Sequence, residues 1–280
     1  MTNTSTAVAV DTEPTVSVVI PTLNEARNLP HVFARIPADT HEVIVVDGRS
    51  TDDTVAVARK LRPTVRIVRQ TRKGKGNALA CGFAAATGDV IAMVDADGSA
   101  DPEEIPLFVR ALTDGADFAK GTRFAAGGGS GDITFLRSLG NKVLCGLFNL
   151  KYRTRHSDLC YGYNVFWRRH VDAFGLDAGE HSDGQPSGER RWGDGFEIET
   201  LLSIRVAVAG LDVQEVGSFE HPRIHGTSNL NTFGDGFRVL RAILAESRRS
   251  RRRATPVSRR PAAIVRGREP EGRTAEGGVR

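Results

Sequence analysis

The chain has 280 residues, of which 40% are apolar, and a formal net charge of +4. This charge is unevenly distributed, because residues 247–280 hold 11 Arg and 3 Glu, which leaves 27 basic and 31 acidic side chains in residues 1–246. A body of this length can bury one large core, and its composition excludes collagen-like, coiled-coil and disulfide-scaffold proteins. Three widely spaced cysteines (Cys81, Cys145 and Cys160) without a CxxC pattern predict reduced thiols in a cytoplasmic protein and no zinc site.

The two ends of the chain differ from the body in composition. Residues 1–14 lack the charged and apolar regions of a signal peptide, and we predict a disordered leader there. Residues 248–280 are rich in Arg, Pro and Gly, and we predict a disordered tail because they cannot bury enough apolar surface. No apolar run approaches the roughly 18 residues that a membrane-spanning helix requires. The folded domain is therefore expected over residues 15–247.

Within this domain, short β-branched runs alternate with segments of helical period, which is the βαβα pattern of a parallel α/β sheet. The predicted strands are 16–21, 42–47, 65–69, 89–95, 117–120, 164–168 and 212–216. The predicted helices are 25–36 with Asn24 as its cap, 52–61, 77–87, 102–112, one near 133–150, 196–209 and 233–247. Residues 177–195 have no period and are rich in Gly, Asp, Glu and Ser, so we expect a functional loop there, such as a mobile lid.

Ligands of open α/β sheets bind at the carboxyl ends of the strands, so the residues that directly follow each predicted strand are the first candidates for a site. Neither GxGxxG after the first strand nor GxxxxGK[ST] anywhere is present, which disfavours dinucleotide oxidoreductases and P-loop NTPases. The candidate segments are PTLNE after the first strand, DGRSTD after the second, DADG after the fourth and GTR after the fifth.

Two carboxylates, Asp95 and Asp97, follow the most apolar strand and bracket one small residue. Oxygen ligands of this kind suit Mg²⁺ or Mn²⁺, which keep open positions for phosphate oxygens. The alternative is structural, with a turn at Asp97 and a helix cap at Asp101. The basic, Gly-rich segment 72–76, which contains Lys75, favours the first reading, because a metal ion and a cation together would clamp a diphosphate.

A series of ordered motifs makes a family resemblance specific. They are VVIPTLNEARNL, VIVVDGRSTDDT, RKGKGNALACGFAAATGD, VIAMVDADGSADPEEI, FAKGTRF and GFEIETLL, and they span about three quarters of the chain. The sequence resembles family 2 glycosyltransferases of the GT-A fold, and within them the dolichyl- or polyprenyl-phosphate mannosyltransferase branch. This resemblance implies a Rossmann-like three-layer α/β sandwich with a mostly parallel central sheet.

The resemblance also implies an activity and a donor site. The expected reaction is an inverting, metal-dependent transfer of one sugar from a GDP- or UDP-sugar, such as GDP-mannose or UDP-glucose. Pro21, Asn24 and Glu25 are similar to the first nucleotide-contacting motif, and Asp47 to the aspartate that binds the base or ribose. Asp95, Ala96 and Asp97 are similar to the metal-binding motif.

The acceptor implied by the resemblance is a polyprenyl or dolichyl phosphate. A phosphate monoester, with a second pKa of about 6, is already ionised at neutral pH and needs a cationic cradle rather than a general base. Arg123 and Arg137 lie where related enzymes hold the lipid phosphate, and a guanidinium suits that anion. The alternative is that both are ordinary surface arginines.

Further residues carry over from the resemblance. Asp158 is similar to the second acidic motif of the family, as a residue that orients sugar or acceptor, although it would alternatively only begin a strand. Glu197 and Glu199 would lie about 200° apart on one helix, so we expect Glu197 to face the cleft and Glu199 to be solvated or to support it. His221 is a candidate third metal ligand, with a structural histidine as the alternative. Asn229 stands where lysine is common in the family.

Several functions compete with the lipid-linked reaction. They are transfer to a soluble acceptor such as phosphoglycerate or a natural product, non-catalytic binding of nucleotide or membrane, and nucleotidyl transfer. The last is disfavoured because PTLNEARN is not the Gly-rich basic loop that nucleotidylyltransferases carry there. The expected partners are the nucleotide sugar, the polyprenyl phosphate, an anionic membrane surface bound by the Arg-rich tail and a membrane protein, with nucleic acid disfavoured. We expect a cytoplasmic protein that is peripheral at the membrane face.

Overall fold

The computed structural model describes residues 13–179, 191–226 and 232–250. Its centre is a seven-stranded sheet of order β3-β2-β1-β4-β7-β5-β8, in which only β7 runs antiparallel to its neighbours. The strands are β1 Val16–Thr22, β2 Glu42–Asp47, β3 Arg66–Arg69, β4 Val90–Met93, β5 Phe118–Thr122, β7 Asn164–Trp167 and β8 Val213–Gly217. The mostly parallel α/β sheet is therefore confirmed.

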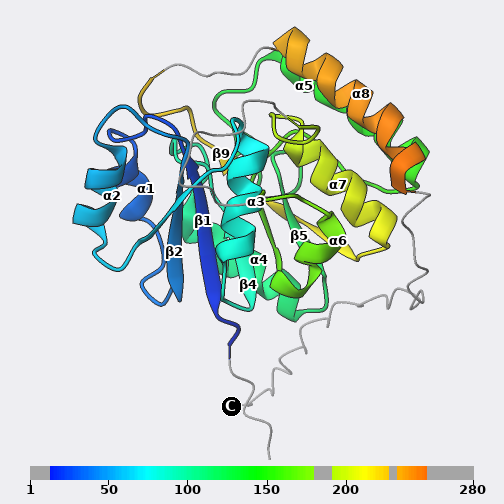
Figure 1. Cartoon of the computed structure of the whole chain (residues 1–280). Coiled ribbons are helices and arrows are strands. Elements are labelled where there is room, and N and C mark those ends of the chain that lie inside the picture. Colours follow the sequence, from blue (N-terminus) through cyan, green and yellow to red (C-terminus); the bar gives the residue numbers. More distant parts are fainter. Residues whose placement is uncertain (1–12, 180–190, 227–231, 251–280) are drawn as a thin grey trace, which may run out of the picture.

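Helices cover both faces of this sheet (Figure 1). On one face, α1 (Leu29–Phe33), α2 (Thr54–Leu61) and α4 (Ile105–Thr113) pack on alternate strand residues such as Val18 and Val43. On the other face, α3 (Lys75–Ala85), α6 (Val171–Phe174) and α7 (Ile198–Ala209) pack on the intervening residues such as Val19 and Ile44. Successive side chains of a strand point to opposite faces, so apolar runs supply two cores at once. This arrangement is the predicted three-layer sandwich.

The two remaining long helices, α5 (Phe135–Tyr152) and α8 (Thr232–Ser250), lie side by side at one edge of the molecule (Figure 1). Their buried side chains, including Phe148 and Ile243, form a third apolar cluster with Ile204 of α7. Lys151 fixes the pair by donating its Nζ to the carbonyl oxygens of Ile243, at 2.7 Å, and Leu244, at 3.0 Å. Both helices therefore face the core with one side and solvent with the other.

The predicted elements are all present; β2 has the predicted bounds, and most others have shifted ends. The helix expected over 25–36 begins at Leu29, and Asn24 is not its cap, because Asn28 holds the N-cap position. The short strands β6 (Gly129–Ser130) and β9 (Phe219–Glu220), which pair with each other, and the short α6 were not predicted. A 3-10 turn (Pro102–Glu104) precedes α4, and a second (Arg168–His170) precedes α6.

The predicted leader and tail mostly lie outside the described residues, as do residues 180–190 of the predicted lid. Helix α8 continues to Ser250, three residues past the expected end of the domain. Among the residues that the structure describes, no helix has the length and apolar character needed to cross a bilayer.

Candidate active site

The candidate donor site lies at the carboxyl ends of β1 and β4, which are neighbours in the sheet. Strand β4 ends at Met93, so Asp95 and Asp97 occupy the turn that follows it. The methyl group of Ala96 between them packs into the core, so only its backbone can face a ligand. Asp95 and Asp97 keep 32% and 23% of their side-chain surface exposed, which leaves both carboxylates within reach of a ligand.

Lys75, at the start of α3, joins Asp95 to a second carboxylate. Its Nζ lies 2.7 Å from Oδ1 of Asp95 and 2.6 Å from Oε1 of Glu199. Burial alone would lower the pKa of Lys75, but the two carboxylates outweigh it and raise this pKa. Gly162 closes over the cluster, because a Cβ there would lie 3.2 Å from Nζ of Lys75 and 3.3 Å from both carboxylates. The cluster thus holds one cation, 16% exposed, between two carboxylates.

Asp97 has different partners from Asp95. Its Oδ1 accepts hydrogen bonds from the backbone N and Oγ of Ser99, at 3.0 and 2.7 Å. Its Oδ2 lies 3.3 Å from Nη1 of Arg223, whose Nη2 also pairs with Glu25. Arg223 therefore links the turn after β4 to the segment after β1. Arg223, which lies two residues after the candidate metal ligand His221, was not singled out from the sequence.

The fit of a divalent cation to this site can be judged from its donors. Asp95 and Asp97 offer the hard, partly exposed carboxylate oxygens that Mg²⁺ and Mn²⁺ prefer. The predicted third ligand, His221, does not complete them: its ring packs against Phe219, and among the described residues no group of three or more His, Cys, Asp or Glu side chains is arranged for a metal. The two aspartates fit a metal, whereas the predicted set with His221 is not assembled.

The other predicted donor residues lie along the same edge. Pro21 is part of β1 and pairs with Val46 of β2. Asn24 adopts a positive φ of 59°, and its Oδ1 accepts a hydrogen bond from the backbone N of Thr51 at 2.8 Å. The carboxylate of Asp47 accepts from the backbone N of Arg49 and Ser50, both at 3.1 Å. Asn24 and Asp47 thus shape the loops that follow β1 and β2.

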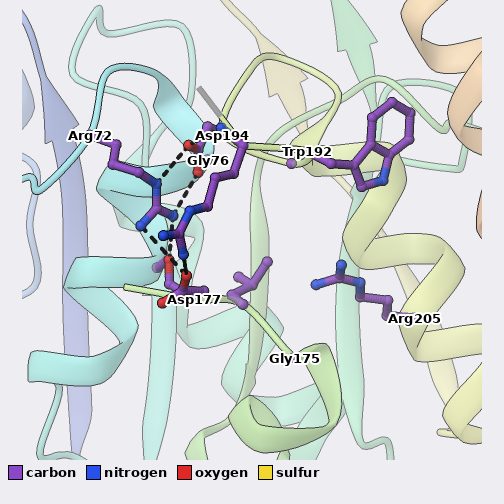
Figure 2. Close-up of a pocket in the computed structure, with 11 residues that line it drawn as sticks. Arg72, Gly76, Gly175, Asp177, Trp192, Asp194 and Arg205 are labelled. Atoms are coloured by element: carbon purple, nitrogen blue, oxygen red, sulfur yellow. Dashed lines mark hydrogen bonds and ion pairs between the residues drawn. The ribbon is translucent and has the colours of Figure 1, made fainter. Parts of the chain in front are cut away.

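The basic segment 72–76 does not present all its cations to the site, because Arg72 points to Asp194 and Asp177 instead (Figure 2). Arg72 is buried and donates to both carboxylate oxygens of Asp194, at 2.8 and 3.0 Å, and to the carbonyl oxygen of Asp177. The backbone N of Gly76 donates to the carbonyl oxygen of Asp194 at 3.0 Å, an approach that a side chain at Gly76 would block. Arg72 therefore holds both ends of the segment predicted as a lid, and Lys75 is the cation at the site.

The positions of the two glutamates distinguish between the roles expected for them. Glu197 precedes the first residue of α7, and its Oε1 accepts from the backbone N of Gly193 and Gly195, at 3.2 and 3.3 Å. Glu199 is buried rather than solvated and pairs with Lys75. The two glutamates contact different groups, as their separation around the helix predicted, but the side chain of Glu197 points to the preceding loop. Glu199 is thus the glutamate next to Asp95.

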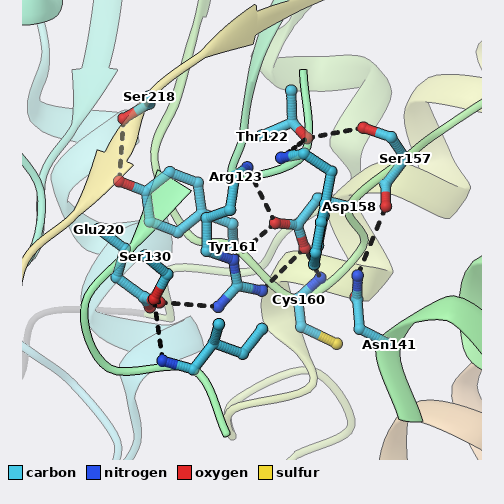
Figure 3. A network of polar contacts seen from close by, with 12 residues as sticks. Thr122, Arg123, Ser130, Asn141, Ser157, Asp158, Cys160, Tyr161, Ser218 and Glu220 are labelled. Atoms are coloured by element: carbon cyan, nitrogen blue, oxygen red, sulfur yellow. Dashed lines mark hydrogen bonds and ion pairs between the residues drawn. The ribbon is translucent and has the colours of Figure 1, made fainter. Parts of the chain in front are cut away.

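A second ionic cluster lies at the end of β5 (Figure 3). Asp158 is fully buried and accepts from Nε and Nη2 of Arg123, at 2.7 and 2.9 Å. Nη1 of Arg123 lies 3.0 Å from Glu220, and its guanidinium lies over the Tyr161 ring. Burial would raise the pKa of Asp158, but the contacts with Arg123 outweigh it and lower this pKa. Arg123 is therefore not the open cation that we expected.

Arg137 stands apart from this cluster. It lies in the first turn of α5, keeps 33% of its side chain exposed and has Nη1 3.5 Å from Asp132. Asp158 does not begin a strand, because β7 starts at Asn164. The segment that leads into α5 reaches the cluster through Ser130, whose Oγ donates to Glu220 at 2.5 Å.

Comparison with known proteins defines the class to which this fold and site belong. Residues 17–174 match the model described as Glycosyl transferase family 2, and the chain belongs to this family. An uncharacterized glycosyltransferase of Mycobacterium tuberculosis is 35% identical over 216 residues, which cover 77% of this chain and 89% of that protein. A dolichol-phosphate mannosyltransferase of Pyrococcus furiosus is 40% identical over 134 residues, 45% of this chain and 38% of that protein.

Among solved structures, glucosyl-3-phosphoglycerate synthase from Mycobacterium tuberculosis is similar in fold. It aligns with a TM-score of 0.61 and 23% identity over 83% of this chain and 79% of that one, and its crystal structure holds Mn²⁺, UDP and glucosyl-3-phosphoglycerate. At this level of identity the likeness concerns the fold, and it confirms the predicted GT-A architecture.

Proposed function

We propose that this glycosyltransferase moves one sugar, with inversion, from a nucleotide sugar to a polyprenyl or dolichyl phosphate. The observation that carries the proposal is the cluster of Lys75 with Asp95 and Glu199, next to Asp97, at the carboxyl edge of the sheet. A fixed cation beside two carboxylates that suit a metal is what a diphosphate leaving group requires, because negative charge builds up on it as the sugar departs.

In this proposal Asp95 and Asp97 hold Mg²⁺ or Mn²⁺, which supplies charge neutralisation on the diphosphate when bound. Lys75 is the second cation, and Glu199 keeps its ammonium group in place. Arg223 sits between Glu25 and Asp97 and couples the nucleotide-side loop to the metal-side turn. Pro21, Asn24, Glu25 and Asp47 form the nucleotide side, for a donor such as GDP-mannose or UDP-glucose.

The acceptor phosphate is proposed to bind between Arg123 and Arg137. Asp158 fixes one side of the Arg123 guanidinium, whereas Glu220, on the other side, is 18% exposed and is the contact that a phosphate can replace. A phosphate oxygen that is already ionised needs no general base, so Asp158 acts here as the residue that orients Arg123. The similarity to a dolichol-phosphate mannosyltransferase supports this acceptor class.

Two alternative functions are distinguished from the proposed one by the donor and acceptor screen described below. The fold shared with glucosyl-3-phosphoglycerate synthase favours phosphoglycerate as a soluble acceptor, and a non-catalytic nucleotide or membrane binder would transfer no sugar. Binding of the Arg-rich tail to an anionic membrane, and a membrane-protein partner, belong to the lipid-linked version of the proposal.

The test is a screen of radiolabelled GDP-mannose, UDP-glucose and related donors against a short-chain prenyl phosphate and against 3-phosphoglycerate, with and without Mn²⁺. We expect Mn²⁺-dependent label in the prenyl product with one donor. Label in phosphoglycerate alone would replace the lipid acceptor with the soluble one. Nucleotide binding without any transfer would contradict the enzymatic assignment.

A further inference from the structure

Helices α5 and α8 expose an unusual amount of apolar surface. Of the fourteen large apolar side chains that are exposed in the described part of the chain, eight lie on these two helices. We call this set the α5–α8 apolar face; it comprises Phe135, Leu136, Leu139, Val143, Leu147, Leu150, Phe237 and Leu244. Contiguous exposed apolar patches of soluble proteins mark interaction sites.

The members on α5 form one continuous stripe. With 3.6 residues per turn, all six fall within an arc of about 120° around the helix axis. The buried residues Asn141, Cys145 and Phe148 lie on the opposite side. Phe135 and Leu150, near the two ends of the stripe, are 85% and 83% exposed. The two ends of the stripe are thus open to solvent, and its middle members keep between 42% and 56% of their surface exposed.

The exposed side of α8 has the same character. Phe237 and Leu244 are 68% and 58% exposed and line a shallow apolar hollow with Leu240, Arg241 and Ala245. Val239, Ala242 and Ile243 on the other side of α8 are buried in the cluster that α8 shares with α5. Both helices thus turn their apolar outer sides away from one common core.

The charges near the α5–α8 apolar face indicate which kind of partner binds there. Helix α5 has no acidic residue and carries Arg137 and Lys142 besides Lys151, whose Nζ is held by carbonyl oxygens of α8. Residues 251–280, which follow α8, hold nine Arg and three Glu. Apolar residues flanked by cations are typical of helices that lie in the interface of an anionic membrane. A second copy of this chain would bring the same positive charges together, which disfavours a homodimer through this face.

The face also lies next to the proposed acceptor site. Its first member, Phe135, comes five residues after Ser130, which contacts Glu220 of the Arg123 cluster. The same Ser130 Oγ accepts a hydrogen bond from the backbone N of Ile133 at 2.9 Å, which fixes the entry into α5. A lipid whose phosphate reaches Arg123 would thus leave the protein beside the start of the apolar stripe.

We propose that the α5–α8 apolar face docks this enzyme onto the surface of an anionic lipid bilayer. The docking rests on the proposed function for its lipid acceptor, but it is a separate property of the fold, because vesicle binding is measured without sugar transfer. Two elements would act together: the apolar stripe inserts among the acyl chains, and the flanking cations contact the headgroups.

The test is co-sedimentation of the full-length protein with vesicles of phosphatidylcholine and phosphatidylglycerol. The variant Leu139→Ser/Val143→Ser/Leu147→Ser removes the centre of the stripe and should lower the partition coefficient at least about tenfold. The matched control is Leu61→Ser/Leu107→Ser, which removes two exposed leucines of α2 and α4 and should bind like the wild type. Equal binding by the stripe variant and the wild type would overturn the proposal, as would equal loss in the control.

Two further variants separate the contributions. Phe135→Ser/Leu150→Ser changes the ends of the stripe, where no packing is lost, and should also weaken binding severalfold. Arg251→Gln/Arg252→Gln/Arg253→Gln neutralises cations after α8 and should weaken binding to anionic vesicles while leaving it sensitive to the stripe variant. If vesicle binding depended on these arginines alone, or if the stripe variant instead turned a dimer into a monomer in light scattering, docking through this face would be wrong.

Sugar transfer to a short, water-soluble prenyl phosphate is measured on the same variants without vesicles. We expect the stripe variants to match the wild type there, because the stripe lies outside the donor and acceptor sites. If neither the wild type nor any variant transfers sugar, the proposed function is contradicted, and vesicle binding still tests the docking proposal. If the stripe variants transfer sugar normally and also bind vesicles like the wild type, only the docking proposal is contradicted.

Discussion

Two ionic clusters of the molecule have the same composition and different surroundings. In each, one cation lies between two carboxylates: Lys75 between Asp95 and Glu199, and Arg123 between Asp158 and Glu220. The side chain of Asp95 is 32% exposed, whereas Asp158 is fully buried. The Lys75 cluster is therefore open to a ligand, and the Arg123 cluster is closed around its own cation.

This difference in exposure predicts different effects of substitutions in the two clusters. A buried pair contributes little net stability, but removing one partner leaves an uncompensated charge in a medium of low polarity. An open carboxylate can change partners at small cost, because water stabilises it meanwhile. We therefore expect substitutions of Arg123 or Asp158 to act first on folding, since the proposed acceptor phosphate reaches Arg123 only by replacing Glu220. Substitutions at the open cluster should act on catalysis.

The largest expected effect is in the closed cluster. Arg123→Ala should lower the free energy of unfolding by about 3–5 kcal/mol, because Asp158 would stay buried without its cation. Urea denaturation of the variant and the wild type measures this loss. The matched control is Arg110→Ala, which removes an 81% exposed arginine from its pair with Asp114 and should cost less than about 1 kcal/mol. A similar small loss for both variants would show that the Arg123 cluster is not closed in solution.

The next effect is at Asp97, beside the open cluster, and concerns catalysis. Asp97→Ala should lower kcat/KM for sugar transfer by about 100-fold or more, because the proposed metal loses a ligand and the leaving diphosphate loses stabilisation. The free energy of unfolding should change by no more than about 1 kcal/mol, since this carboxylate is partly exposed. Asp114→Ala is the exposed control. Metal-dependent turnover that survives in Asp97→Ala would remove the metal assignment.

The sequence predicted the strands and the two aspartates at the sheet edge, but not the ionic contacts within the two clusters. Strand β2 has the predicted bounds, because its apolar run is interrupted sharply at both ends. Asp95 and Asp97 were located because they follow a buried strand, and such positions meet at one sheet edge. The pairings of Lys75 with Glu199 and of Arg123 with Asp158 join residues far apart in the chain, and no local period encodes which cation meets which carboxylate.

The third prediction concerns pH and a histidine next to the closed cluster. Burial, with a smaller contribution from Lys120, lowers the pKa of His156 from 6.5 to about 4. Its Nε2 has no hydrogen-bond partner among the described residues, and its ring packs on Phe148. The unfolded chain therefore binds more protons than the folded protein between about pH 4 and pH 6.5, so stability falls as the pH is lowered through this window.

The free energy of unfolding should fall by about 2 kcal/mol from His156 between pH 7 and pH 5. Denaturation of the wild type and of His156→Phe at both pH values measures this contribution, since phenylalanine keeps the ring and loses the titration. Equal pH dependence in the two proteins would contradict it. The lowered pKa of Asp158 acts separately, because its stabilisation is lost only as the pH falls below the usual aspartate value of 3.8.

The smallest expected effect distinguishes the roles of two glutamates, Glu197 and Glu199, that lie two residues apart. Glu199→Gln should lower kcat roughly tenfold with little change in the donor KM, since Lys75 loses the carboxylate that holds it beside Asp95. Glu197→Gln should instead lower the melting temperature and leave kcat within about twofold, because its carboxylate only holds the backbone of Gly193 and Gly195. Steady-state kinetics and thermal denaturation of both variants give the comparison. A larger loss of kcat in Glu197→Gln would restore the assignment made from the sequence and would mean that the loop, rather than the Lys75 cluster, carries the group that reaches the substrate.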